Sequence, residues 1–241
     1  MSQRDPAIRD FEIMPLSERC ALVSFGNVID QSVNEKVLFL HRALLHSAFE
    51  GFVESVPAYA SLAVFYDFLQ VTKSAGANSF LFVKHYLEHI LQADIKISKS
   101  ISAPIKIPVC YDSEFGPDID RVAEGHGLSA DEVVRLHTSV IYRVYMVGFM
   151  PGFAYMGTVD EKLVTPRKDQ PRLHVPAGSV GIAGSQTGIY PIDSPGGWQI
   201  IGRTPLQLFN ADMPTPCLLS AGDQIQFVSI DKEEFLRTDV H

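Results

Sequence analysis

Residues 148–205 constrain this chain more than any other stretch, because glycine and proline interrupt them throughout. They hold 10 of the 17 glycines and 7 of the 15 prolines. Glycine permits positive φ and close backbone approach, whereas proline fixes φ and lacks an N–H donor, so neither favours long helices or strands. Apolar residues such as Val175, Ile182 and Ile200 alternate with these breakers. Short apolar runs between turn signals predict small β-strands in a barrel or sandwich.

Charge is distributed unevenly along the chain. The net charge of −8 argues against nucleic acid as the main partner, because neutralising phosphates needs a basic surface. Residues 143–203 carry six Lys or Arg side chains against four Asp or Glu, a local charge of +2. Between Arg172 and Arg203 the only formal charge is that of Asp193. We therefore expect a tight apolar β-structure with basic margins that binds a small anionic ligand.

Cysteine usage and hydropathy indicate where in the cell the protein is expected. Cys20, Cys110 and Cys217 lie far apart and form no C-x-x-C pair, so neither a disulfide framework nor a zinc ribbon is expected. The first ten residues lack the apolar core of a signal peptide. The longest uncharged apolar run, 144–156, is too short to span a bilayer. We expect a soluble, cytoplasmic protein.

The pattern of apolar residues predicts two domains. Residues 1–95 are expected to hold two short strands within 11–25, a helix at about 30–49, strands at 51–56 and 60–66, and a helix at 76–93. This order predicts a small open α+β sandwich. The polar, serine-containing segment 96–104 is the expected linker.

Residues 105–241 are predicted to form a second domain rich in β-structure. We expect a strand at 105–111, short helices at 118–124 and 129–137, and a strand at 139–147 that leads into the stretch rich in glycine and proline. Ser129 and Glu132 fit the S-x-x-E capping box that starts a helix. Closing strands are expected at 206–209, 217–219 and 224–230.

Two short motifs have simple structural explanations. His85, Glu88 and His89 fit the H-x-x-E-H pattern of inverted zinc peptidases, but no obvious third carboxylate ligand follows. We interpret them as the polar face of a helix and predict no metal site. Residues 125–130 imitate a dinucleotide fingerprint, yet a helix instead of a strand precedes them, so a turn between helices is expected. No P-loop and no G-x-S-x-G motif occur in the sequence.

Several side chains of the stretch 148–205 have both a structural and a functional interpretation. Trp198 is either a core anchor or a ring on which a ligand stacks, and His174 has either a hydrogen-bonding or a catalytic role. Guanidinium groups bind carboxylates and phosphates bidentately. Four basic residues are therefore either solvated turn residues or an oxyanion site: Arg167, Lys168, Arg172 and Arg203.

Four segments together resemble a known family, and the resemblance extends over nearly the whole chain apart from the first few residues and 70–103. They are VPAYASLAVFYD at 56–67, IPVCYDSEFGPDID at 107–120, YRVYMVGFMPGFAYMG at 142–157, and the long run from TPRKDQPRLHVPAG to RTPLQLF at 165–209. The chain resembles the allophanate hydrolase subunit 1 / KipI family. This resemblance implies an α+β fold, with a small N-terminal sandwich followed by a cyclophilin-like β-barrel.

The resemblance also implies a function. It implies a component of an ATP-dependent 5-oxoprolinase, a cyclic amide hydrolase that opens 5-oxo-L-proline to L-glutamate. Two partner proteins are implied: PxpC, which resembles allophanate hydrolase subunit 2, and PxpA. ATP with magnesium is expected at a site shared with a partner, so the chain alone should be nearly inactive. Two alternatives stay open, a KipI-like inhibitor of a sensor histidine kinase and a lobe of an allophanate or urea carboxyltransferase.

The predicted site residues of this function all lie in the same stretch. Anion binding is assigned to three arginines: Arg167, Arg172 and Arg203. His174, for proton transfer, and Arg203 are the catalytic candidates. Recognition of substrate or ATP is assigned to Gln186, Tyr190 and the pocket wall Trp198. Close backbone approach to a ligand or partner is assigned to five glycines: Gly152, Gly181, Gly184, Gly196 and Gly197.

Overall fold

The structure is a computed structural model that describes residues 11–75, 78–92 and 103–238. The chain divides into two units, Met1–Ser100 and Ile101–His241, and each is described by itself. Of the predicted linker at 96–104, all but the last two residues lie outside the described ranges. No helix in those ranges is long and apolar enough to cross a membrane.

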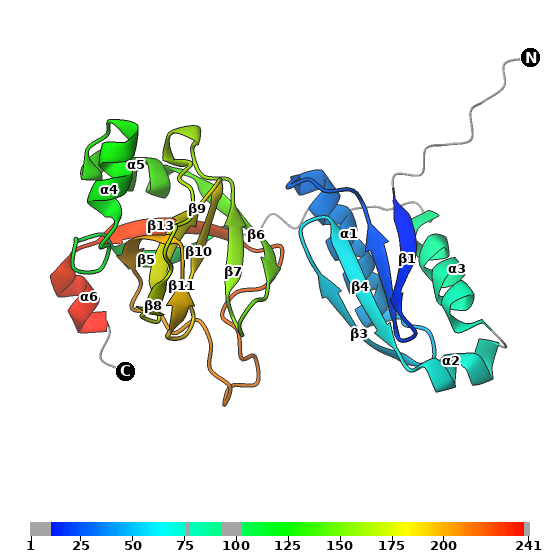
Figure 1. Cartoon of the computed structure of the whole chain (residues 1–241). Coiled ribbons are helices and arrows are strands. Elements are labelled where there is room, and N and C mark those ends of the chain that lie inside the picture. Colours follow the sequence, from blue (N-terminus) through cyan, green and yellow to red (C-terminus); the bar gives the residue numbers. More distant parts are fainter. Residues whose placement is uncertain (1–10, 76–77, 93–102, 239–241) are drawn as a thin grey trace, which may run out of the picture. The chain divides into compact units, whose positions relative to one another are not determined.

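The N-terminal unit is a four-stranded antiparallel sheet packed against helices (Figure 1). The strand order is β1-β2-β4-β3, with β1 at Glu12–Ser17, β2 at Cys20–Ser24, β3 at Phe52–Pro57 and β4 at Ser61–Tyr66. The helices are α1 (Gln31–His46), α2 (Phe68–Ala75) and α3 (Ser79–Gln92). The predicted strands and the two predicted helices are confirmed. The sequence prediction missed α2, at whose start Asp67 accepts hydrogen bonds from the N–H groups of Leu69 and Gln70.

Alternation along the strands explains the core of this unit. Ile13, Val23 and Leu62 stand opposite one another on three neighbouring strands and share one face of the sheet. They pack against Leu40 of α1 and Leu87 of α3 in a single buried cluster. The helices therefore cover this face. Alternate residues of each strand and one stripe of each helix are apolar, and these apolar surfaces pack together.

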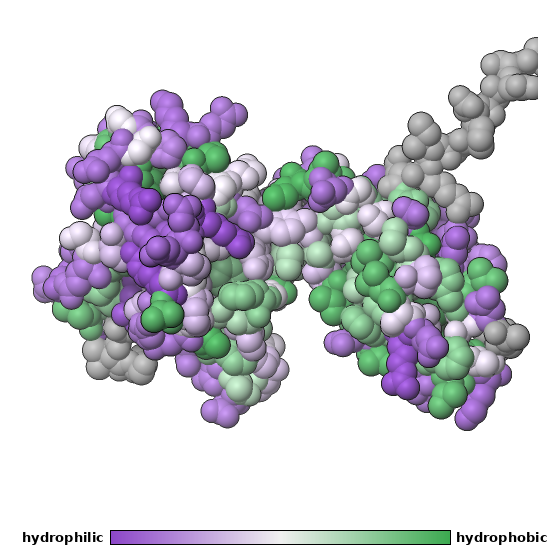
Figure 2. Space-filling model, in the orientation of Figure 1, coloured by the Kyte–Doolittle hydropathy of each residue, from purple (hydrophilic) through white to green (hydrophobic). Residues whose placement is uncertain are grey.

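The opposite face of the sheet carries a second apolar row. Met14, Leu22, Ala63 and Val56 lie in register across all four strands. Val56 is 43% exposed and the other three are partly exposed, so the helices of the unit leave this face open. Figure 2 shows apolar surface spread over the viewed side of the N-terminal unit.

The C-terminal unit is a closed barrel with helices on one side of it (Figure 1). Its strand order is β10-β7-β6-β13-β5-β12-β9, in which β5 and β13 are parallel and the other pairs antiparallel. The barrel strands are β5 (Ile105–Cys110), β6 (Ile141–Val147), β7 (Ala154–Gly157), β9 (Ser179–Ala183), β10 (Gln186–Ile189), β12 (Gln199–Arg203) and β13 (Gln224–Ile230). A separate ribbon pairs β8 (Arg172–Val175) with β11 (Ser194–Gly196). The remaining elements are α4 (Ile119–His126), α5 (Ala130–Ser139), the short 3-10 helix η1 (Glu161–Leu163) and α6 (Lys232–Thr238).

The stretch 148–205 forms the small strands that its breakers predict. Its strands β7 to β12 are three to five residues long. The turn between α4 and α5 is also confirmed, because Gly127 ends α4 at φ 64° and Ser129 with Glu132 forms a complete capping box.

Two of the predicted closing strands are wrong. Residues 206–209 and 217–219 form only an isolated bridge between Phe209 and Cys217. Pro214 and Pro216 interrupt the chain just before that bridge, and proline cannot donate to a strand ladder. The third closing strand, β13, is confirmed, and the sequence prediction missed α6.

A buried polar chain crosses the core of the barrel. Thr187 donates its hydroxyl proton to the Gly181 carbonyl, so it accepts from Nε2 of His137, at 2.9 Å. Nδ1 of His137 then accepts from the Tyr111 hydroxyl at 2.8 Å. Burial lowers the pKa of His137 to about 3, so the ring is neutral and structural.

Candidate functional site

A cavity of about 180 Å³ opens in the C-terminal unit, within the stretch that the sequence singles out. We call it the aromatic pocket. Its walls come from β7 and the turn before it, the loop before β8, the segment after β10, the end of β11 and the turn between β11 and β12. The lining residues are Phe149, Phe153, Tyr155, Arg167, Lys168, Pro171, Tyr190, Gly196, Gly197 and Trp198.

Phe153 is the centre of a set of rings that form the pocket wall. Its ring lies 4.7 Å from that of Tyr155, 5.2 Å from Tyr190 and 5.4 Å from Trp198, in edge-to-face arrangements. Phe153, Tyr190 and Trp198 are almost fully buried. Edge-to-face pairs of buried rings are stable packing arrangements, so the wall is preformed.

A glycine brings the backbone against this wall. A Cβ atom on Gly196 would lie 2.5 Å from the hydroxyl oxygen of Tyr190, closer than any side chain allows. The pocket therefore has its present shape because residue 196 has no side chain.

Phe149 stands at the mouth of the pocket in an unusual backbone conformation. It has φ of 73°, and its side chain is 73% exposed. A residue other than glycine at positive φ costs about 1–3 kcal/mol, and such strain clusters at ligand sites. The exposed ring packs edge-on against Phe153 and extends the aromatic wall outward.

Arg167 supplies a positive charge beside the same rings. Its guanidinium carbon lies 5.9 Å from the ring centroid of Trp198, within cation–π distance. Burial raises the pKa values of Tyr155 and Tyr190, and the nearby Arg167 charge opposes part of both rises. Within the described ranges Arg167 forms no ion pair with a carboxylate.

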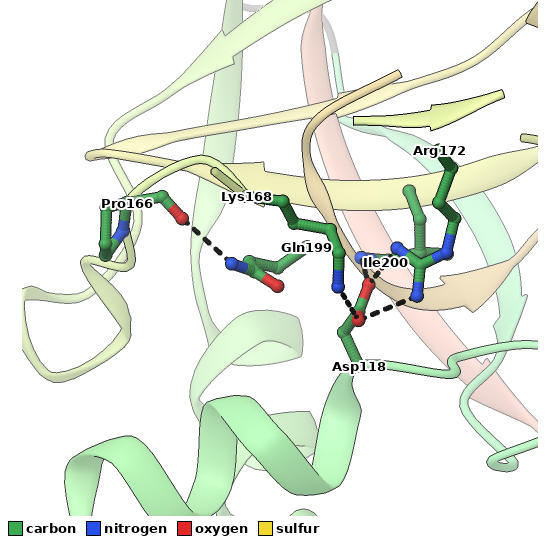
Figure 3. Close-up of polar contacts among 6 residues, drawn as sticks. All are labelled: Asp118, Pro166, Lys168, Arg172, Gln199 and Ile200. Carbon is green, nitrogen blue, oxygen red and sulfur yellow. Dashed lines mark hydrogen bonds and ion pairs between the residues drawn. The ribbon is translucent and has the colours of Figure 1, made fainter. Parts of the chain in front are cut away.

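Lys168 also joins the pocket to a group of charged residues, the Asp118 cluster, in which Asp118 holds the two basic side chains Lys168 and Arg172 (Figure 3). Arg172 donates to both oxygens of Asp118, at 2.6 and 2.8 Å, and Lys168 donates to Oδ1 at 2.8 Å. The N–H of Ile200 donates to Oδ2 at 2.7 Å. Burial favours the neutral carboxyl, but the hydrogen bonds from Arg172, Lys168 and Ile200 together lower the pKa of Asp118. The carboxylate is therefore ionised and fully paired.

The Asp118 cluster fixes the loop that carries Arg167. Asp118 precedes α4, and its partners lie in the loop before β8, at the start of β8 and on β12. The loop is held further by the N–H of Lys168, which donates to the Gly197 carbonyl at 2.7 Å. The Gln199 amide donates to the carbonyl of Pro166 at 3.0 Å (Figure 3). These contacts on both sides of Arg167 set its position at the pocket.

Five of the predicted site residues meet at the aromatic pocket: Arg167, Tyr190, Gly196, Gly197 and Trp198. The other predicted charged residues have partners elsewhere. Arg172 is paired with Asp118, and Arg203 donates through Nε to the Ala177 carbonyl while its guanidinium lies over the Phe235 ring. His174 is exposed and contacts Asp193 at 3.1 Å.

The remaining predicted residues lie outside the lining of the pocket. Gln186 is partly buried at the start of β10, and Gly184 lies at φ 58° in the hairpin before it. Gly152 packs its backbone against Phe209, and Gly181 against Trp198.

Sequence reasoning missed four of the ten pocket-lining residues and the whole role of Asp118. The missed lining residues are Phe149, Phe153, Tyr155 and Pro171, whereas Lys168 is one of the four basic residues that the sequence offers as an oxyanion site. The dense aromatic run in GFMPGFAYMG is a signal that would have found three of them. Asp118 carries no local signal, because its partners lie 50 and 54 residues away.

Comparison with known proteins identifies the family. The chain belongs to the family described as carboxyltransferase domain, subdomain C and D, whose sequence pattern matches residues 11–219. The predicted family and the predicted fold class, mixed α and β structure with a closed barrel, are thereby confirmed.

Two curated relatives are both named as the B subunit of 5-oxoprolinase. The relative from Bacillus subtilis is 43% identical over 231 residues, which cover 93% of this chain and 95% of that protein. The relative from Haemophilus influenzae is 38% identical, covering 90% of this chain and 96% of that protein. Among solved structures, TTHA0988 matches with a TM-score of 0.75 and 35% identity, covering 88% of this chain. This chain corresponds to 40% of the length of TTHA0988.

Proposed function

We propose that this chain is the B subunit of an ATP-dependent 5-oxoprolinase, which opens 5-oxo-L-proline to L-glutamate. One observation carries the proposal: the match to the 5-oxoprolinase B subunit of Bacillus subtilis runs over 95% of that protein at 43% identity. A match over nearly the whole of both chains supports a shared role better than a match to one domain does.

The chemistry explains what such a protein has to offer. A lactam carbonyl is a poor electrophile, and transfer of a phosphoryl group to its oxygen makes cleavage of the C–N bond accessible. Phosphoryl transfer depends on positioning and on positive charge more than on covalent catalysis. The aromatic pocket supplies fixed surfaces that can position a small substrate, and Arg167 supplies a positive charge beside them that has no carboxylate partner in the described chain and can bind an anionic group of that substrate.

ATP and magnesium belong to a site that a partner protein completes. Among the described residues, no group of three His, Cys, Asp or Glu side chains is placed to hold a metal ion. The proposed partners are PxpC and PxpA, and the chain alone is proposed to be nearly inactive.

Reconstitution tests the proposal. The chain is purified with its candidate partners PxpA and PxpC, and formation of glutamate and ADP from 5-oxo-L-proline is measured while each protein is omitted in turn. We expect both products only when all three proteins are present. Glutamate formation that persists without this chain would refute the proposed role.

A further inference from the structure

The size of the aromatic pocket limits what it can hold. A cavity of about 150 Å³ accommodates a molecule of benzene, and pockets for drug-sized ligands measure about 300–1,000 Å³. At about 180 Å³, the aromatic pocket matches one small ring with a substituent. A purine nucleotide, with a fused base, a ribose and phosphates, is larger than this volume and would have to extend outside the pocket.

The walls favour a compact ring. Phe153, Tyr190 and Trp198 are buried and fixed by their mutual packing, so they present fixed surfaces to a ligand. Such walls bind a rigid five-membered ring at little cost in conformational entropy, because neither partner loses torsional freedom.

The charge at the pocket favours a carboxylate. Arg167 is exposed beside Trp198, whereas Lys168 is engaged by Asp118. The carboxylate of Asp118 is satisfied by four hydrogen bonds and does not compete for Arg167. A guanidinium without an anionic partner binds a carboxylate bidentately.

We infer that the aromatic pocket binds 5-oxo-L-proline itself, with the lactam ring between the aromatic walls and the carboxylate on Arg167, and that it does not bind ATP. This inference rests on the proposed function for the identity of the substrate. It assigns the substrate to this chain and leaves the nucleotide to the site shared with a partner.

Fluorescence of Trp198 gives a direct readout, because it is the only tryptophan of the chain and lies in the pocket wall. The full chain is titrated with 5-oxo-L-proline, with 2-pyrrolidinone (the lactam without a carboxylate), with L-proline (a cationic ring nitrogen and no lactam) and with ATP. We expect a saturable change with 5-oxo-L-proline, binding of the other two rings weaker by about tenfold or more, and no saturable change with ATP. A saturable change with ATP, or no saturable change with 5-oxo-L-proline, would overturn the inference.

Measurements of KM on the assembled enzyme test this inference separately from the proposed function. We expect Arg167→Met to raise KM for 5-oxo-L-proline by about tenfold or more while KM for ATP stays unchanged. Arg121→Met, on the exposed side of α4, is the matched control and should change neither KM. If Arg167→Met leaves KM for 5-oxo-L-proline at the value of the control, the inference is wrong and the proposed function stands. If the assembly makes no glutamate while the chain alone binds 5-oxo-L-proline, the proposed function is wrong and the pocket assignment stands.

Discussion

Arg167 and Lys168 are neighbours in sequence, yet they belong to two regions with different electrostatics. Lys168 points away from solvent into the Asp118 cluster, where its side chain is 16% exposed and donates to a buried carboxylate (Figure 3). Arg167 lies exposed at the aromatic pocket and contacts a ring. The comparison shows that two neighbouring basic residues can have different roles, one stabilising the fold and the other available to bind a ligand. The buried carboxylate of Asp118 determines the roles, because it pairs with Lys168 and not with Arg167.

The largest effect is expected at Asp118. Asp118→Ala leaves Lys168 and Arg172 without their shared carboxylate, and breaking a buried ion pair costs about 3–5 kcal/mol. Because the basic partners are partly exposed, we expect a loss at the lower end, about 3 kcal/mol, measured by urea unfolding. Asp120→Asn, at an exposed acid in the first turn of α4, is the control. Equal losses in the two variants would contradict the importance of the cluster.

The pH dependence of the same site has a definite sign. The pKa of Asp118 is lowered in the folded protein, so the folded state binds fewer protons than the unfolded state at acid pH. The stabilisation is present above the unfolded pKa of about 3.9 and is lost as the pH falls through the folded value. The difference in stability between wild type and Asp118→Asn should therefore shrink below about pH 4, as followed by unfolding at several pH values. A difference that stays constant would show that the charge of Asp118 contributes nothing.

The next effect is expected in the pocket wall. Gly196→Ala places a methyl group on the Tyr190 hydroxyl, and such overpacking costs about 1–3 kcal/mol. We expect a loss of about 2 kcal/mol together with a weaker Trp198 response to 5-oxo-L-proline. Gly125→Ala, in α4 with open space around the new methyl group, should be neutral or slightly stabilising. Unchanged stability of Gly196→Ala would mean that Tyr190 moves freely and that the wall is not preformed.

The two regions also differ in how far the sequence predicts them. The small strands, the turn at Gly127 and the capping box at Ser129 are encoded by local signals, and the structure confirms them. The sequence predicts that Arg172 binds an anionic ligand, but in the structure Arg172 is paired with the carboxylate of Asp118, 54 residues away in the same chain. No local pattern distinguishes an arginine that binds a ligand from one that binds a distant carboxylate.

Neighbouring substitutions test the comparison directly. Lys168→Met removes a charge-assisted hydrogen bond to a buried carboxylate, so we expect a loss of about 1.5 kcal/mol. Arg167→Met removes a cation–π contact at an exposed site, and we expect a loss below about 1 kcal/mol. Thermal and urea unfolding of both variants measure the difference. If the two variants lose equal stability, the assignment of a structural role to Lys168 and a binding role to Arg167 is wrong.

The smallest effect is expected at His174, the residue for which the sequence suggested proton transfer. His174 is exposed, contacts the equally exposed Asp193 and lies outside the pocket lining. An exposed polar contact of this kind contributes little to stability, because solvent screens it. General acid–base catalysis raises the rate of a reaction by about 10²–10⁴-fold. If His174 were the catalytic acid or base, its substitution with glutamine would lower kcat by at least about a hundredfold. We expect His174→Gln to lower kcat of the assembled enzyme by less than about tenfold, since no described group of the pocket is within its contacts. A hundredfold loss with unchanged stability would return His174 to the catalytic residues and extend the site from the aromatic pocket to β8.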